Sequence, residues 1–437
     1  MNNGPTVSVV SILLLLLAAA VLAEEPAPPP RRSLSDIIEN LPFGLNGFFE
    51  ARAGTRTQSD RHISKTATIA ETRLQLEITK VFEIGDFAPE LRIKGDLLYD
   101  GVMANTKADL REAYVLFSPL ETVDLKIGRQ VLTWGTGDLL FINDLFPKDW
   151  VSFFIGRDDE YLKAPSDAVR LSYYGDWANV DLVYTARFRP DEYVTGERLS
   201  YWSDALGRRA GEDNTVADEV PEDWFSDDEF ALRIFRNIRG YEFALYAYRG
   251  YWPTPAGMDP TTFDATFPKL SVYGASFRGP VLKGIGNVEF GYYDSRDDRI
   301  GDDPLVRNSE LRLLVGYEQE IGHDFTAGLQ YYLEWIMDYD DYRRTLPPAI
   351  HSRDQLRHVL TLRLTKLLMN QNLTLSFFAY YSPSDSDAYL RPKVHYKVSD
   401  HWAAEVGANI FLGSRDHTFF GMFERDTNVY CGARYSF

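Results

Sequence analysis

The most regular feature of the chain is a series of short segments in which apolar and polar residues alternate. In residues 68–80, one face carries Thr72, Leu74, Leu76 and Ile78, and the other carries Glu71, Arg73, Gln75 and Glu77. Successive side chains of a strand point to opposite faces, so this pattern predicts a strand with one apolar face. About eighteen such strands are predicted, at 44–55, 68–80, 88–99, 108–118, 122–133, 167–175, 178–189, 229–237, 240–251, 269–279, 285–295, 307–319, 324–337, 355–366, 371–382, 388–398, 401–412 and 428–437.

The connections between these segments alternate in length. Those after even-numbered strands are short, as at 118–121, 175–178, 237–240, 320–324 and 399–400. Those after odd-numbered strands tend to be long, as at 134–166, 190–228, 252–268, 338–354 and 413–427. Short turns at one end and long loops at the other are typical of bacterial outer-membrane barrels. An even strand count places both termini on the periplasmic side.

An apolar outer face and a polar inner face suit a sheet that closes on itself in lipid, where every backbone group must be paired internally. The expected fold is therefore all-β, a transmembrane antiparallel barrel. A soluble sandwich or propeller is the alternative. No repeat of 40–50 residues supports a propeller, and charged strand residues would interrupt a sandwich core.

The N-terminal 42 residues are predicted to precede the barrel, which spans 43–437. Residues 7–23 form an apolar run that ends in small residues, which predicts an export signal over 1–23, although no Lys or Arg precedes the run. A retained membrane anchor is the alternative. Residues 24–42 read as a Pro-rich periplasmic linker with a short amphipathic helix.

The last predicted strand ends on an aromatic residue. Val429, Cys431, Ala433, Tyr435 and Phe437 share one face of it. This pattern resembles the C-terminal strand by which the barrel assembly machinery recognises outer-membrane barrels. The resemblance implies that Phe437 and Tyr435 act as the assembly signal.

Composition narrows the function classes. The chain has 26 Tyr and 27 Phe and a single cysteine, so no intramolecular disulfide forms. The net charge of −18 argues against nucleic acid as a partner. Much of the acidity lies in residues 212–229, which we expect to face lipopolysaccharide through bridging divalent cations. The lumenal candidates Tyr332, Tyr380 and Tyr389 are interpreted as girdle residues, with a sugar-stacking slide as the alternative.

One long connection, 134–166, is too apolar for a solvated loop, because exposing its Leu, Phe and Trp side chains would be costly. We expect this loop to fold into the barrel and narrow it, with packing on the rim or on a neighbouring subunit as the alternative. At this point the chain resembles porins with an inward-folded constriction loop. The stretch LKIGRQVLTWG, residues 125–135, also resembles a strand end of alginate-export-type and related barrels.

The charged residues of this loop and of the lumen face are the candidate site. The predicted pore and constriction residues are Asp138, Asp144, Lys148, Arg157, Asp158, Asp159, Arg170, Arg187, Arg363, Arg391 and Lys393. The lumen carries both signs of charge, whereas the exporter of an anionic polysaccharide should be strongly electropositive. Away from the loop, lumenal Arg–Glu pairs are expected to brace the wall.

These observations favour an outer-membrane porin for small hydrophilic solutes or ions. The alternatives are an export barrel for an anionic polysaccharide, a sheath for a periplasmic partner and, less favoured, a barrel enzyme. We expect no enzymatic activity, cofactor or metal, because the chain has no Gly-x-Ser-x-Gly elbow and no paired-His motif. The expected partners are outer-membrane lipid, lipopolysaccharide and the assembly machinery, and assembly into a homo-oligomer is left open.

Overall fold

The computed structural model describes residues 42–437 except residues 86 and 349, and Leu45–Phe437 form one compact unit. The predicted export signal at 1–23 lies outside the described residues, as does the predicted linker at 24–42 apart from Pro42. Among the described residues, no helix is both long enough and apolar enough to cross a membrane.

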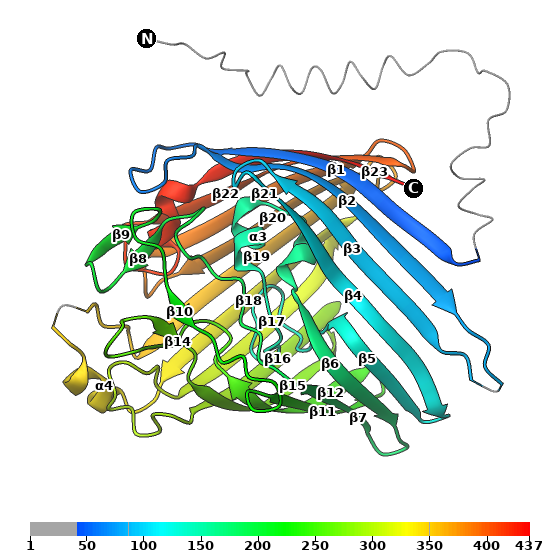
Figure 1. Ribbon diagram of the computed structural model, residues 1–437, viewed down its shortest axis with the longest axis horizontal. Helices are drawn as coiled ribbons and strands as arrows, with labels where there is room; N and C mark the ends of the chain where they lie inside the picture. Colours follow the sequence, from blue (N-terminus) through cyan, green and yellow to red (C-terminus); the bar gives the residue numbers. More distant parts are fainter. Residues whose placement is uncertain (1–41, 86, 349) are drawn as a thin grey trace, which may run out of the picture. The chain divides into compact units, whose positions relative to one another are not determined.

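Eighteen strands form one antiparallel sheet in which each strand pairs with the next barrel strand along the chain (Figure 1). The sheet closes because β1 (Gly44–Arg56) also pairs with β23 (Asn428–Ser436). The prediction of an eighteen-stranded barrel is confirmed. The other sheet strands are β2 (Ala67–Val81), β3 (Glu90–Asp100), β4 (Asn105–Leu120), β5 (Val123–Val131), β6 (Pro165–Tyr174), β7 (Asn179–Thr185), β11 (Glu229–Ile238), β12 (Tyr241–Tyr251), β15 (Lys269–Val281), β16 (Gly284–Ser295), β17 (Glu310–Gly322), β18 (Phe325–Ile336), β19 (Leu356–Leu368), β20 (Leu373–Ser382), β21 (Asp387–Lys397) and β22 (Trp402–Gly413).

The strands alternate as the sequence pattern requires. On β2, Glu71, Arg73 and Gln75 are buried inside the barrel, whereas Leu76 is 40% exposed on its outer face. Large apolar side chains are exposed on many other strands, for example Phe49 and Val406. A sheet with this outer face is stable in lipid, which solvates apolar side chains but not unpaired backbone groups.

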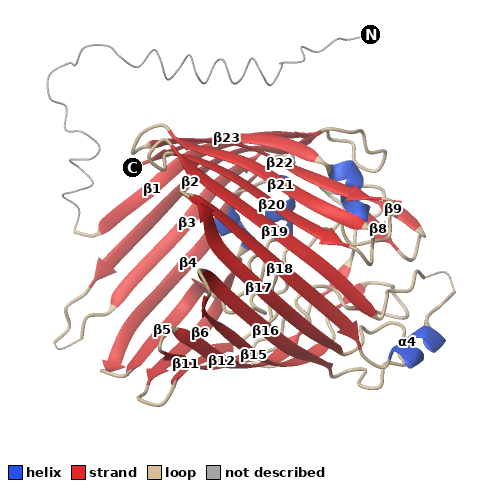
Figure 2. Cartoon of the chain, turned by 180° about the vertical axis from the view of Figure 1, so that it is seen from behind, coloured by secondary structure: helices blue, strands red, loops and turns tan. Residues whose placement is uncertain are grey.

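The two ends of the barrel differ. One end carries short turns, for example Arg239 and Gly240 between β11 and β12. The other end carries the long loops, which contain the short strands and two of the four helices of the described chain: β8 (Tyr201–Ser203), β9 (Arg208–Ala210), β10 (Asp218–Glu219), β13 (Gly257–Met258), β14 (Ala265–Thr266), α4 (Tyr339–Thr345) and η2 (Gly421–Asp426). Figure 2 shows α4, β8 and β9 together at this long-loop end.

One strand is shorter than predicted. The pattern placed a strand at 178–189, but β7 ends at Thr185. Phe188 leaves the sheet because its ring packs against Tyr251 and Phe267, with centroids 5.0 and 5.5 Å away. The alternation of apolar and polar residues in the sequence therefore continues past the end of β7, although the sheet stops there.

Candidate functional site

The connection between β5 and β6, residues 132–164, crosses the interior of the barrel and is called the inward loop. Its Leu139 carbonyl accepts a hydrogen bond of 2.9 Å from the Tyr380 hydroxyl of β20. Its Phe154 carbonyl accepts one of 3.1 Å from Nδ2 of Asn428 on β23. These strands are far around the sheet from β5, so the prediction of an inward-folded loop is confirmed and packing on the rim is wrong.

Residues 134–155 of the inward loop, here the apolar half, are held mainly by aromatic packing. Asp149 caps α3 (Trp150–Ile155) by accepting a hydrogen bond of 2.7 Å from the Ser152 amide. The Phe154 ring then packs against Phe411 and Phe423, with centroids 5.6 and 4.8 Å away. Burial of such rings is the main stabilising contribution available to this half.

The girdle interpretation of three tyrosines is wrong. Tyr332, Tyr380 and Tyr389 face inward and are at most 6% exposed. The Tyr389 ring lies 5.7 Å from both Phe153 and Phe154, measured between centroids. These side chains are therefore part of the buried cluster against which the apolar half packs.

Residues 156–164, here the charged half, are held by ion pairs. Arg157 reaches Glu71 of β2, with Nε 3.0 Å from Oε2. Asp158 and Asp159 lie 3.2 and 2.8 Å from the Nη2 atoms of Arg434 and Arg391, respectively. The two halves meet at Gly156, whose φ of +91° ends α3 and whose missing Cβ leaves room for the Tyr430 ring.

The electrostatics of the charged half follow from burial and these partners. Burial raises the pKa of Asp159, but the charges of Arg391 and Lys393 outweigh it and hold the pKa below its ordinary value. Burial also raises the pKa of Tyr161, whose ring lies between the guanidinium groups of Arg73 and Arg111, 3.8 and 4.6 Å from the centroid. Asp159 is therefore ionised and Tyr161 neutral at neutral pH.

The structure brings most predicted site residues together. Arg363 donates to Asp138 through Nη2 over 2.6 Å, which joins β19 to the apolar half. Lys393 lies 3.8 Å from Asp159 and 3.5 Å from Glu405. With Arg157, Asp158 and Arg391, these residues link the inward loop to the wall.

Four predicted site residues lie elsewhere. Asp144 and Lys148 were expected at the aperture, but they form a 2.9 Å ion pair at the centre of the apolar half, with side chains 1% and 3% exposed. Burying both charges together satisfies each of them. Arg187 lies in the loop after β7, 3.7 Å from Glu222. Arg170 is on β6 and has no ion-pair partner among the described residues.

Elsewhere on the lumen face, the expected Arg–Glu bracing is present. Arg92 Nη2 lies 3.0 Å from Glu77, and Arg312 Nη2 lies 2.7 Å from Glu310. Such pairs join neighbouring or successive positions of the wall and satisfy charges that water reaches poorly.

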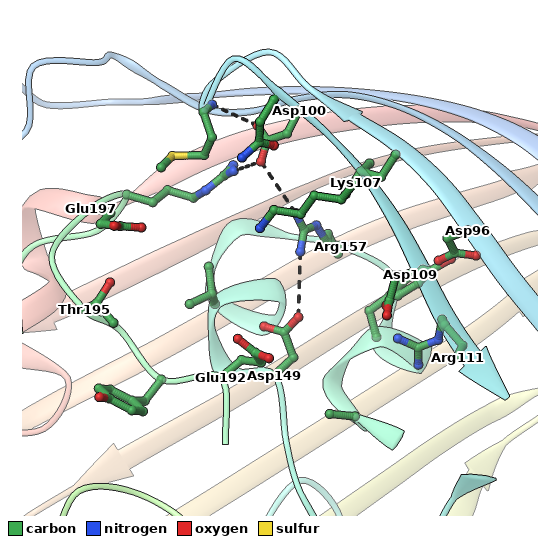
Figure 3. Close-up of a pocket in the computed structure, with 18 of the residues that line it drawn as sticks. Asp96, Asp100, Lys107, Asp109, Arg111, Asp149, Arg157, Glu192, Thr195 and Glu197 are labelled. Carbon is green, nitrogen blue, oxygen red and sulfur yellow. Dashed lines mark hydrogen bonds and ion pairs between the residues drawn. The ribbon is translucent and has the colours of Figure 1, made fainter. Parts of the chain in front are cut away.

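The charged half borders a cavity of about 580 Å³ that faces β3, β4 and the loop after β7 (Figure 3). It is lined by six cations and six carboxylates: Arg73, Lys107, Arg111, Arg157, Arg189 and Arg198, with Asp96, Asp100, Asp109, Asp149, Glu192 and Glu197. Most are paired; Arg198, for example, contacts Asp100. Within the described chain, no ion pair involves Lys107, Asp109, Arg111 or Glu197, so these four charges line the cavity without a partner of opposite charge.

The sequence interpretation missed one wall of this cavity. The connection 190–228 was expected to be an outer loop, but Arg198, Leu199 and Ser200 are buried at the barrel mouth. Arg198 Nη1 donates 2.8 Å to the Thr68 carbonyl, and the Ser200 amide donates 3.0 Å to Asp426. A short run of mixed residues carries no periodic signal that could have indicated this burial.

The Gly-Arg-Gln stretch, residues 128–130, has a structural role where the inward loop begins. Gly128 has a φ of +123°, which favours glycine. Arg129 forms bonds of 2.7 and 2.6 Å to Asp167 of β6, and Gln130 Nε2 donates 3.0 Å to the Ala168 carbonyl. These contacts fasten β5 to β6 where the chain leaves the sheet.

The described residues include no group of three or more His, Cys, Asp or Glu side chains arranged to hold a metal ion.

Comparison with known proteins places the fold. No protein-family model matches the chain, and no curated protein matches it. Among solved structures, it is similar to OccAB3 of Acinetobacter baumannii, with a TM-score of 0.56 and 11% identity over 90% of this chain and 98% of that one. It is also similar to OccD3 (OpdP) of Pseudomonas aeruginosa, with a TM-score of 0.53 and 8% identity over 90% of each chain. Both are bacterial outer-membrane porins, so the chain has the fold of an outer-membrane β-barrel of the porin type.

Proposed function

We propose that this barrel is a weakly selective channel in the outer membrane of a Gram-negative bacterium, through which small hydrophilic solutes or ions diffuse. The observation that carries the proposal is the charged half of the inward loop, which has charged side chains exposed on two sides. Toward the long-loop end it borders the 580 Å³ cavity. Toward the short-turn end, the side chains of Asp158 and Asp159 are 32% and 40% exposed.

The packing of the apolar half also favours a solute route along the charged half. It fills its side of the barrel with buried rings and hydrogen bonds, which leave little polar surface for a hydrated solute. We infer that solutes pass along the charged half, where Asp158, Asp159 and Lys393 meet water. This proposal keeps the predicted role of these three residues and moves Asp144 and Lys148 out of the aperture.

Export of an anionic polysaccharide, which the alginate-export resemblance would imply, fits this route less well. A polyanion needs a conduit with excess positive charge. The cavity is lined by equal numbers of cations and carboxylates, and its four unpaired charges are two basic and two acidic, so it carries no excess of positive charge. A catalytic role has no comparable support from the arrangement of the site.

The test is conductance of the refolded chain in planar lipid bilayers, with reversal potentials measured in a salt gradient. We expect steady ohmic conductance with weak ion selectivity. The double variant Asp158→Asn, Asp159→Asn should shift selectivity toward anions, because it removes two exposed negative charges from the aperture. Asp176→Asn is the matched control, because Asp176 is exposed in the turn between β6 and β7.

A folded barrel without conductance would overturn the channel proposal. Equal selectivity in the double variant and the wild type would overturn the assigned route but not the channel. Preferential block by a soluble polyanion such as alginate, over neutral sugars of similar size, would instead favour the export function.

A further inference from the structure

A second cavity, of about 430 Å³, lies on the long-loop side of the apolar half and is called the aromatic pocket. The inward loop contributes Phe141 and Trp150 to it, the wall contributes Tyr332 and Tyr380, and the long loops contribute Val194 and Met422. The channel route proposed above does not use this pocket. The inward-loop residues that line it all belong to the apolar half, and none belongs to the charged half.

The aromatic pocket presents apolar surface that the barrel itself does not cover. Phe141, Trp150, Val194 and Met422 pack against the buried core but are only partly buried. Covering such surface with an apolar ligand is favourable. Its volume lies within the usual range for small-molecule sites, and a cavity of about 150 Å³ already holds benzene, so a substituted aromatic ring fits.

One polar group at the wall of this pocket lacks a partner. Arg307 and Arg312 line the pocket, but both form ion pairs with Glu310, at 2.7 Å each, and both also lie within 4.0 Å of Glu334. Arg357 uses its Nε to donate 2.6 Å to Asp385, and its buried Nη2 atom has no hydrogen-bond partner among the described residues. A buried donor without an acceptor is costly, so a ligand that supplies an acceptor here gains binding free energy.

We propose that the aromatic pocket binds a small aromatic compound that carries one hydrogen-bond acceptor. The ring occupies the space between Trp150, Tyr332 and Met422, and the acceptor takes a hydrogen bond from Nη2 of Arg357. A sugar fits this site poorly, since most of its hydroxyl groups would face apolar side chains without partners.

The first test compares acetophenone, an aromatic ring with a carbonyl acceptor, with ethylbenzene, which lacks the acceptor. Each is titrated against the refolded barrel in amphipol and its binding is followed by ligand-observed NMR. We expect acetophenone to bind at concentrations about tenfold lower than ethylbenzene, as a hydrogen bond to a charged group predicts. Glucose at the same concentrations should not bind.

Two variants assign the effect to this pocket. Met422→Trp places a large ring in the aromatic pocket and, because Met422 does not line the 580 Å³ cavity, should weaken acetophenone binding at least about tenfold through this pocket alone. Arg357→Met keeps the apolar stem but removes the donor, so it should weaken acetophenone binding about tenfold and leave ethylbenzene binding unchanged. Arg343→Met is the matched control, because Arg343 lies in α4 and does not line the pocket.

This NMR readout does not need a conducting channel, so the pocket and the channel can be tested separately. Saturable acetophenone binding in a barrel without conductance would overturn the channel proposal and support this one. The absence of saturable binding up to about 10 mM, where a ligand of millimolar affinity would saturate, would overturn it. So would equal binding by the wild type and by both folded pocket variants.

Discussion

The two halves of the inward loop are continuous in sequence but are fixed to the barrel by different interactions. Residues 134–155 are held by buried rings, whereas residues 156–164 are held by ion pairs such as Arg157 with Glu71. Apolar packing excludes water, while ion pairs tolerate water beside them. The difference is consistent with one segment that both fills part of the barrel and borders the hydrated route that we propose.

The apolar half should be the stronger anchor, and removing one ring tests this directly. Phe154→Ala deletes contacts with Tyr389, Phe411 and Phe423, and loss of a buried aromatic side chain costs about 3–5 kcal/mol. We expect the loop to detach from its seat, so that single-channel conductance rises and proteases cleave within residues 134–164. Phe49→Ala is the control, since Phe49 is 49% exposed on the outer face. Wild-type conductance and protection in Phe154→Ala would show that the ion pairs suffice.

The charged half should set ion selectivity, through charges that are not neutralised. Lys107→Glu reverses one such charge in the cavity, so we expect the ratio of cation to anion permeability to rise by roughly twofold to fivefold. Reversal potentials measure this ratio. Lys283→Glu makes the same change in an exposed turn between β15 and β16 and should have little effect. Equal shifts in the two variants would mean that net charge, rather than the cavity, sets selectivity.

A buried carboxyl group joins the apolar half to the loop after β7, and its titration makes the attachment of the apolar half depend on pH. Asp191 accepts hydrogen bonds of 2.8 Å from the Lys148 amide and 2.7 Å from Trp150 Nε1. Burial raises the pKa of Asp191 to about 7. A carboxyl whose pKa is raised in the folded state contributes stability that is present at low pH and lost as the pH rises through about 7. As in Phe154→Ala, a loosened loop should raise the conductance, so transitions to higher-conductance levels in single-channel records should become more frequent as the pH rises toward about 7.

Asp191→Asn should remove most of that pH dependence, because the amide stays neutral and its oxygen still accepts a hydrogen bond. Records of the variant at both ends of the pH range provide the measurement. A variant with the full wild-type pH dependence would place the titrating group elsewhere.

The smallest effect is expected at the outer rim, remote from both halves. The rings of His351 and His417 stack with centroids 3.9 Å apart, and Trp202 packs against their edges, so three long loops meet there. Burial, followed by the charges of His351 and Arg415, lowers the pKa of His417, although Asp204 and Asp385 oppose the shift. The stack is therefore stable at neutral pH and loses stability as the pH falls below about 6.5.

The hydrogen-exchange protection factors of residues 201–210, which are corrected for the intrinsic pH dependence of exchange, should accordingly be lower in mild acid than at neutral pH. His417→Asn should reduce this difference, and protection factors that are unchanged across the pH range would contradict the assignment.

The sequence predicted the barrel because alternation is a local property that each strand repeats. It also predicted that residues 134–166 fold inward, because exposing their many apolar side chains to water would be unfavourable. The three tyrosines show a signal that was available but not used: Tyr332 lies two positions from Glu334, on the polar face, and therefore points inward. The burial of the Asp144–Lys148 pair could not be predicted, because it depends on how distant segments pack around it.

The hydrogen bonds of the inward loop have a consequence for the order of folding. Phe154 is bonded to Asn428 across 274 positions, and Gly156 accepts a bond of 2.8 Å from Arg52 across 104 positions. Both partners belong to β1 and β23, the first and last strands, whose pairing is the final joint of the cylinder. Contacts between such distant parts of a chain form late, since their loop-closure entropy must be overcome first. Insertion of the inward loop and pairing of β1 with β23 therefore depend on the same contacts. A loop that stayed outside until β1 and β23 had paired would have to enter a barrel that is already closed.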